Sequence, residues 1–139
     1  MAKRWISRLS EEEQREVLES VSEALKEIDK IENRDIRRIL RTVAKFCYRI
    51  GGKTEYDGYE DLYVVRCIVP DGLGFLSASY IGRGGRAGLY TERDISEFKV
   101  PEDWVVTVES GAKRVRGFRV AISKSLTEEG VYNIEISPI

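Results

Sequence analysis

The chain has no histidine and very little of several other residue types. Its 139 residues include one methionine, one glutamine, two asparagines, three prolines and two cysteines. Without histidine, acid–base or nucleophilic catalysis would have to use carboxylates, lysine, tyrosine or a bound metal ion. Ser–His and Cys–His pairs are ruled out, and no carboxylate pair has a telling spacing. The composition therefore disfavours an enzyme, although it does not exclude one.

The scarcity of amide side chains coincides with a high content of charged residues, 34% of the chain. Few thermolabile amides together with many Glu, Lys and Arg residues are typical of hyperthermophile proteins, in which networks of ion pairs contribute to stability. Charged residues anywhere in the chain can therefore have a purely structural role. Each functional interpretation of a charged segment has to be compared with that simpler explanation.

The two cysteines, Cys47 and Cys67, lie inside apolar stretches and form no CxxC motif. We expect them to be buried, unpaired small hydrophobic residues in a reducing cell, not a disulfide or a metal site. No apolar run approaches the roughly 20 residues of a membrane span, and the N-terminal end lacks a signal-peptide core. The sequence predicts a soluble, cytoplasmic protein with no membrane partner.

The most regular stretch of the chain runs over residues 33–50. Asn33 or Asp35 can cap a helix here, and Gly51-Gly52 can end it. Apolar residues recur at steps of three and four, which predicts one buried side. These residues are Ile36, Ile39, Leu40, Val43, Phe46, Cys47 and Ile50.

A second helix is predicted before it, from about Ser10 to Ile31. Ser10 and Glu13 form a capping box, and an acidic first turn suits the helix dipole. Its apolar seam has a heptad-like spacing, broadened by Leu18 and Leu25. The seam consists of Val17, Val21, Ala24, Ile28 and Ile31. We expect the two helices to form a hairpin after a short basic arm at residues 1–9.

From residue 53 onward the apolar period changes from 3.6 to 2, which indicates strands. We expect a tight turn at 56–59, which contains Asp57-Gly58, and another turn at 70–72. Residues 89–103 give no clear pattern, and Pro101 argues against a central strand there. The expected strands cover 62–69, 73–81, 104–109, 113–123 and 131–137. The predicted fold is α+β: one domain, residues 1–139, with the helical hairpin of residues 10–50 packed on one face of a mainly antiparallel sheet of about five strands, residues 53–139.

Charge is arranged in blocks along the chain. Residues 10–32 contain nine acidic and three basic residues, whereas residues 34–53 contain seven basic residues and one acidic residue. Further basic blocks occur in the arm, at 82–93 and at 111–125, and each block carries an aromatic residue. Basic surfaces with aromatic rings bind nucleic acids, because cations neutralise phosphates and rings stack on bases.

The segment 82–88, Gly-Arg-Gly-Gly-Arg-Ala-Gly, is the most distinctive local motif. We expect a loop whose four glycines expose backbone N–H groups while Arg83 and Arg86 reach an anion. It matches neither a phosphate-binding P-loop nor a dinucleotide fingerprint. A plain hairpin tip is an equally good interpretation.

These patterns lead to a first hypothesis: a small non-catalytic protein that binds the phosphate backbone of DNA or RNA, with no cofactor and no metal. The expected contact residues are Trp5, Arg34, Arg37, Arg38, Arg41, Lys45, Arg49, Arg83, Arg86, Lys113, Arg114, Arg116 and Arg119. The alternative for the basic helix is that the acidic first helix neutralises it across the hairpin.

Two other functions stay open at this point. The chain could be an interaction or assembly subunit of a thermophile complex, forming an oligomer or docking through the helical hairpin. Less supported is a metal-dependent nuclease or phosphate-handling enzyme built on an acidic cluster in which Glu55 would lie opposite Glu60. That cluster consists of Glu55, Asp57, Glu60 and Asp61. The choice between DNA and RNA, the base preference, the oligomeric state and the biological process do not follow from the sequence.

Overall fold

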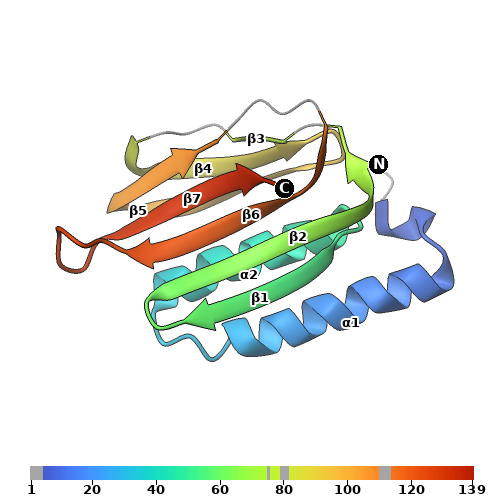
Figure 1. Cartoon of the computed structure of the whole chain (residues 1–139), viewed down its shortest axis with the longest axis horizontal. Coiled ribbons are helices and arrows are strands. Elements are labelled where there is room, and N and C mark those ends of the chain that lie inside the picture. The colour runs from blue at the N-terminus through green and yellow to red at the C-terminus, as the bar shows by residue number, and fades with distance from the viewer. Residues whose placement is uncertain (1–4, 75, 79–81, 110–113) are drawn as a thin grey trace.

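The computed structural model describes residues 5–74, 76–78, 82–109 and 114–139. A short 3₁₀ helix precedes two α-helices, and strands make up the rest, as predicted for an α+β fold (Figure 1). The elements are η1 (Trp5–Arg8), α1 (Glu11–Ile28), α2 (Arg34–Arg49), β1 (Lys53–Tyr59), β2 (Leu62–Leu73), β3 (Leu76–Ala78), β4 (Gly82–Thr91), β5 (Ile95–Val108), β6 (Val115–Lys124) and β7 (Tyr132–Pro138).

The strands form one mixed sheet in the order β1-β2-β6-β7-β5-β4-β3. Neighbouring strands are antiparallel except β5 and β7, which run parallel over Val105–Val108 and Asn133–Ile136. The prediction of about five mainly antiparallel strands was too low in number. The two extra strands are β1, where a tight turn was expected, and β4, which contains the segment 82–88 that was expected to be a loop. The strand β5 also begins earlier than expected, at Ile95 within the unassigned residues 89–103.

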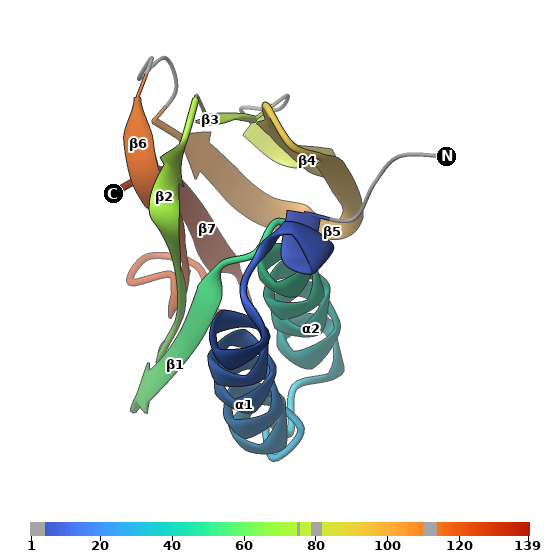
Figure 2. The ribbon, with the colours of Figure 1, turned by 90° about the vertical axis from the view of Figure 1, so that its right-hand side faces the viewer.

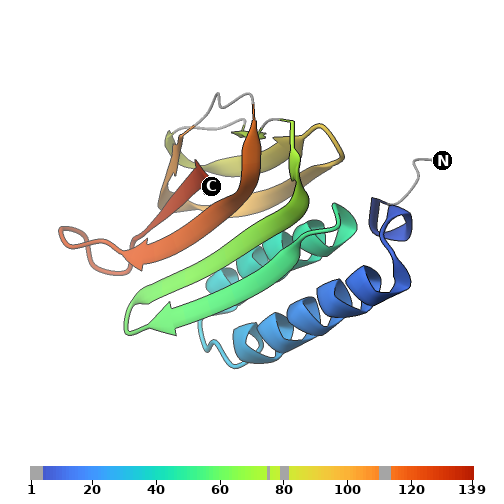
Figure 3. The ribbon, with the colours of Figure 1, turned by 45° about the vertical axis from the view of Figure 1, so that its right-hand side comes forward.

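The sheet is strongly curved, and the helices lie on its concave side. Figure 2 shows β1, β2, β6 and β7 forming one wall, while β5, β4 and β3 curl over α2. The helix α1 runs alongside β1, at one edge of the sheet (Figure 3). The predicted hairpin thus packs on one face of the sheet.

The core forms where α2 meets the concave face. Seven of its residues are buried, and Ile39, Leu40 and Phe46 are completely inaccessible to solvent. The Phe46 ring lies 5.9 Å from the ring of Phe118 on β6, centroid to centroid. The apolar stripe predicted for this helix is therefore the centre of the buried cluster that joins helices and sheet.

The helix α1 follows the prediction in its start and its buried side. Ser10 and Glu13 make the reciprocal capping box, and Val17, Val21, Ala24 and Ile28 are buried. The helix ends at Ile28, three residues earlier than expected. Leu18, placed on the apolar seam, is half exposed.

The cysteines correct one prediction. Cys47 on α2 and Cys67 on β2 form a disulfide, with Cα atoms 5.7 Å apart. Both residues are completely buried, as expected, but they are not unpaired. Helix packing on the sheet brings together two residues that are 20 positions apart, a proximity that spacing in the sequence does not reveal. The bond fastens α2 to β2, the strand next to the β1 edge of the sheet.

The tight turn expected at Tyr56-Asp57-Gly58-Tyr59 is wrong. These residues belong to β1, and the chain reverses at Glu60-Asp61, where Glu60 has φ 51°. A Cβ atom at Gly58 would lie 2.4 Å from the Tyr56 hydroxyl oxygen, so this glycine makes room for a ring that lies along the strand. The residue opposite Glu55 is Arg66 and not Glu60. The side chains of Glu55 and Arg66 form an ion pair of 3.8 Å.

The turn predicted at residues 70–72 is also wrong. These residues lie within β2, which continues to Leu73 with a shift in register after Ile68. The irregularity accommodates Gly72, whose φ is 78°. Residues 70–72 have the composition of a turn, but they form a bulge because β2 pairs with β6 again beyond them, where Leu73 lies opposite Val115.

The glycine-arginine segment is a strand and not a loop. It forms the first part of β4, with a register shift between Arg83 and Gly85. Gly84 has φ 66°, and a Cβ atom there would lie 2.5 Å from the Glu102 Cα atom. The glycines therefore let β4 bulge against β5, which argues for close backbone packing rather than an open anion-binding loop.

Pro101 lies within β5, a strand with neighbours on both sides. It is tolerated because the β4 pairing is interrupted between Val100 and Val105, and β7 pairs with β5 only from Val105 onward. The missing N–H of proline therefore leaves no ladder hydrogen bond unmade.

Candidate functional site

The exposed side of α2 carries the strongest concentration of positive charge. A shallow surface groove of about 390 Å³ runs along it, and none of the described residues that line this groove is acidic. Steps of three and four residues place its cations on one side of the helix, opposite the buried stripe. The lining residues are Arg34, Arg37, Arg38, Arg41, Thr42 and Lys45. Five of the predicted contact residues thus share one surface, called the α2 groove below.

Some of these cations have partners within the chain. The Arg41 guanidinium donates to Asp29 at the end of α1 (Nη1–Oδ1 2.6 Å), and Arg38 pairs with Asp35 on its own helix at 3.3 Å. Arg37 donates from Nη1 to the Ile31 carbonyl oxygen at 2.9 Å. In the described part of the chain, neither Arg34 nor Lys45 has an acidic partner, and Arg41–Asp29 is the sole ion pair between the two helices. Neutralisation of α2 by α1 is therefore limited to one side chain.

A second hollow of about 590 Å³ adjoins the α2 groove and shares Arg34 and Arg38 with it. Its far side is formed by Lys99, Pro101 and Glu102 of β5. Lys99 extends the cationic surface beyond the helix, and two acids, Asp35 and Glu102, also line this hollow. No sequence pattern indicated that Lys99 lies here. No pattern in residues 89–103 shows that β5 passes beside the start of α2.

Arg49, at the end of α2, has an intramolecular role. Its Nε atom donates to Asp94 at 2.9 Å, and Nη2 donates to the Ile95 carbonyl oxygen at 3.3 Å. The guanidinium also lies 5.3 Å from the Phe46 ring centroid. Of the predicted helix cations, Arg49 is the one that links α2 to the start of β5.

The two arginines of β4 face acidic side chains. Arg83 makes a two-pronged contact with Glu128 in the β6–β7 connection, with distances of 2.7 and 3.2 Å. This contact lowers the pKa of the Glu128 carboxyl and raises the pKa of Arg83. Arg86 lies 3.8 Å from Glu97 on the neighbouring strand. The segment 82–88 therefore adds less free cationic surface than its composition suggests.

The predicted cations of β6 do not join the α2 groove. Phe118 faces α2, so strand alternation places Arg119 on the opposite side of the sheet, where Arg66 of β2 is its register partner. Arg114 and Arg116 are exposed. Lys113 lies outside the described residues. The basic blocks are thus divided between two faces of the molecule.

Trp5, expected to contact nucleic acid, lies in η1 between two arginines. The Arg8 guanidinium is 4.0 Å from its ring and that of Arg93 is 4.5 Å. The Arg93 side chain is buried, and it donates to the carbonyl oxygens of Ile50 and Gly72, both at 2.8 Å. Sequence reasoning counted Arg93 as loop charge, because no local pattern reveals a buried arginine that joins η1, the end of α2 and the β2 bulge.

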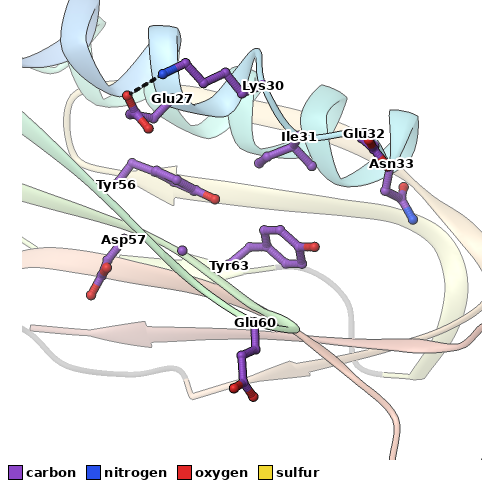
Figure 4. A pocket seen from close by; sticks show the side chains of 10 residues that line it. Glu27, Lys30, Ile31, Glu32, Asn33, Tyr56, Asp57, Glu60 and Tyr63 are labelled. Atoms are coloured by element: carbon purple, nitrogen blue, oxygen red, sulfur yellow. Dashed lines mark hydrogen bonds and ion pairs between the residues drawn. The ribbon is translucent and has the colours of Figure 1, made fainter.

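A third hollow lies between the helix connection and the β1–β2 hairpin, with a volume of about 590 Å³ (Figure 4). Tyr56 and Tyr63 point into it, whereas Asp57 and Glu60 point away from the helices. Burial is the main cause that raises the pKa of both tyrosines. The nearby charge of Glu27 adds to it for Tyr56, and that of Glu32 for Tyr63.

The acidic cluster of the β1–β2 hairpin does not converge on one point. Within the residues that the structure describes, no three acidic or cysteine side chains are placed to hold a metal ion. Glu55 is paired with Arg66, and strand geometry spreads the other acids along the hairpin. A metal-dependent reaction therefore has no support from geometry.

Compared with protein-family models, with curated proteins and with solved structures, the chain has no significant match. In the described residues, no helix has the length and apolar character needed to cross a membrane. Functional inference thus depends on the grooves and charged surfaces of the molecule itself.

Proposed function

We propose that the protein binds the phosphate backbone of a nucleic acid through the α2 groove. The observation that carries this proposal is a groove whose described lining residues include five cationic side chains and no acidic one. Phosphate contacts of this kind supply most of the affinity of non-specific nucleic-acid binders, whatever the net charge of the whole protein. The neutral-to-acidic balance of the chain, with a net charge of −1, does not weaken the argument.

The geometry of α2 suits a backbone contact better than base reading. From Arg34 to Lys45 the helix extends about 16 Å, at roughly 1.5 Å per residue. That length faces several phosphates of one strand, and Lys99 adds a cation at the Arg34 end. The opposite side of α2 is buried against the sheet, so the helix presents one face to its partner. Backbone contacts position a protein without selecting sequence.

The proposed binding site contains fewer residues than the set of contact residues predicted from the sequence. Arg49, Arg83 and Arg86 lie outside the α2 groove and pair with acidic residues there, and Arg119 lies on the other side of the sheet. Assembly through the helical hairpin has less support, because its apolar stripes are used inside the chain. Among the described hairpin residues, Leu18 is the one large apolar side chain at half exposure.

The test is salt-dependent binding of mixed-sequence DNA and RNA by the variant Arg34→Ala/Lys45→Ala. Each lost phosphate contact should lower the log–log salt slope by about 0.7–0.9, so the slope should fall by about 1.4–1.8. Binding should weaken equally for all sequences. These two cations have no acidic partner in the described part of the chain, so the melting temperature should stay unchanged.

The matched control is Arg15→Ala/Lys26→Ala, which removes the same charge from exposed positions of α1. It should leave the slope intact. A third variant, Arg66→Ala/Arg119→Ala, removes two register partners and asks whether the opposite face contributes. Equal losses in all three variants would show attraction by charge in general, and no salt-sensitive binding at micromolar protein would refute the proposal.

A further inference from the structure

The outer edge of β1 is an unpaired strand edge. The strand pairs with β2 on one side only, because it is the first in the sheet order. The Thr54 N–H points outward and donates to Ser20 Oγ of α1 at 3.0 Å. Antiparallel alternation then turns the backbone groups of Tyr56 and Gly58 outward as well. Within the described residues they meet no partner on that side, and such groups can accept an added strand.

A groove follows this edge. The hollow between the helix connection and the β1–β2 hairpin shares Glu27 and Tyr56 with a second hollow of about 360 Å³, which lies between α1 and the start of β1. Figures 1 and 3 show α1 running alongside β1 over this stretch. The two hollows adjoin at Glu27 and Tyr56 and lie along the free edge, and together they are called the β1 groove below.

The lining of the β1 groove is strongly acidic. Among the described residues, its one lining cation is Lys30, which pairs with Glu27 at 3.1 Å, and Arg66 of β2 lies 3.8 Å from Glu55. Carboxylates stand on both sides of the edge, since Glu23 and Glu27 come from α1 whereas Glu55 and Asp57 come from β1. An added strand, whose side chains alternate between two faces, would meet negative charge on each of them. The six carboxylates are Glu23, Glu27, Glu32, Glu55, Asp57 and Glu60.

Two tyrosines favour the same class of ligand. Tyr56 and Tyr63 are half-buried, and both rings point into the β1 groove (Figure 4). Lysine and arginine side chains bind well where an aromatic ring accompanies a carboxylate, because the ring attracts the cation and the apolar stem of the side chain packs on it.

A second copy of this chain does not fit the groove. Pairing β1 with the β1 of another molecule would bring Glu55 and Asp57 of both copies together, and like charges on adjacent strands are destabilising. The charge of the groove selects a partner of opposite sign.

We propose that the β1 groove binds an extended, lysine- or arginine-rich peptide segment, which adds to the sheet as a strand beside β1. Main-chain hydrogen bonds to Tyr56 and Gly58 supply the attachment, and the carboxylates select basic side chains, as in other strand-addition interfaces. This inference does not depend on the nucleic-acid proposal, because the β1 groove shares no residue with the α2 groove.

The experiment uses the full chain and an eight-residue peptide of alternating lysine and threonine. Binding should slow hydrogen exchange at the Tyr56 and Gly58 amides, with little change at Thr54, whose N–H is already bonded. The variant Glu23→Gln/Glu27→Gln should weaken binding by about threefold to tenfold, as expected for exposed charge pairs. Its control, Glu12→Gln/Glu19→Gln, makes the same charge change on α1 outside the groove and should bind normally.

Two further outcomes separate strand addition from attraction by charge alone and from self-association. The same peptide methylated on its four central backbone nitrogens keeps its charge but cannot pair, and equal binding by it would overturn the proposal. Protection of Tyr56 and Gly58 that depends on protein concentration without peptide would overturn it too, by assigning the edge to a second copy. The variant Arg34→Ala/Lys45→Ala should bind the peptide as well as the unmodified chain, which keeps this test independent of nucleic-acid binding.

Discussion

The two α-helices are adjacent, amphipathic and oppositely charged, yet the molecule uses them differently. The helix α2 lies against the concave face of the sheet, is joined to β2 by a disulfide and buries seven residues. The helix α1 lies at the β1 edge and buries four. Its carboxylates line the β1 groove, whereas the cations of α2 line a groove of their own. Opposite charges on neighbouring helices therefore need not cancel, because each helix presents its charge in a different direction.

The largest expected effect tests whether α2 is the more deeply packed helix. Leu40 on α2 is completely buried, and Leu18 on α1 is 50% exposed. Leu40→Ala should lower the free energy of unfolding by about 2–5 kcal/mol through lost burial and a cavity. Leu18→Ala should change it by about 0.5 kcal/mol or less. Urea denaturation measures both values, and equal losses would contradict the difference between the helices.

The disulfide is a second difference between the two helices, because it joins α2 to the sheet and does not involve α1. A cross-link that closes a loop of this size stabilises a fold by about 3 kcal/mol. The variant Cys47→Ala/Cys67→Ala should lose about that much in chemical denaturation. Reduction of the unmodified chain under denaturing conditions should have a similar effect. Equal midpoints with and without reductant would mean that the bond contributes nothing to stability.

The two tyrosines of the β1 groove give a pH-dependent test at the end of α1. Their raised pKa means that folding favours the neutral phenol, so this contribution is complete below about pH 10. This stabilisation should be lost as pH rises toward and through the folded-state pKa, because the two tyrosines ionise at a lower pH in the unfolded chain than in the folded protein. Tyr56→Phe/Tyr63→Phe should flatten the fall in unfolding free energy that begins as pH rises through about 10. An unchanged slope would show that other groups cause the loss.

The smallest effect concerns the one described ion pair between the helices. Arg41 and Asp29 are each almost half exposed, so their pairing should be worth about 0.2–1 kcal/mol. Arg41→Gln should therefore change stability slightly while weakening nucleic-acid binding. A loss of several kcal/mol in thermal or chemical unfolding would instead mean that α1 does neutralise α2.

The helices were predictable because the information that forms them is local. The capping box at Ser10, the Asn33 cap and the apolar stripes act within a few residues, and all appear in the structure. The strands were harder to predict from the sequence than the helices, particularly where they contain glycine. Asp57-Gly58 and the 82–88 segment have turn compositions, yet their glycines serve close packing against Tyr56 and against the backbone of Glu102. Such contacts depend on which strands become neighbours.

The amino-acid sequence by itself determined the α+β class, the helical hairpin, the buried side of α2 and the row of cations on its other side, because helical periodicity turns spacing directly into direction. Tertiary structure alone decided the rest. Packing of α2 on the sheet paired Cys47 with Cys67, and packing around η1 buried the Arg93 side chain. The arrangement of the strands placed Arg119 on the face of the sheet away from Arg34, and it placed Lys99 beside Arg34. It also left β1 at an edge, facing the acidic helix. These relations join residues distant in the chain, and folding brings them together only through burial of the shared core.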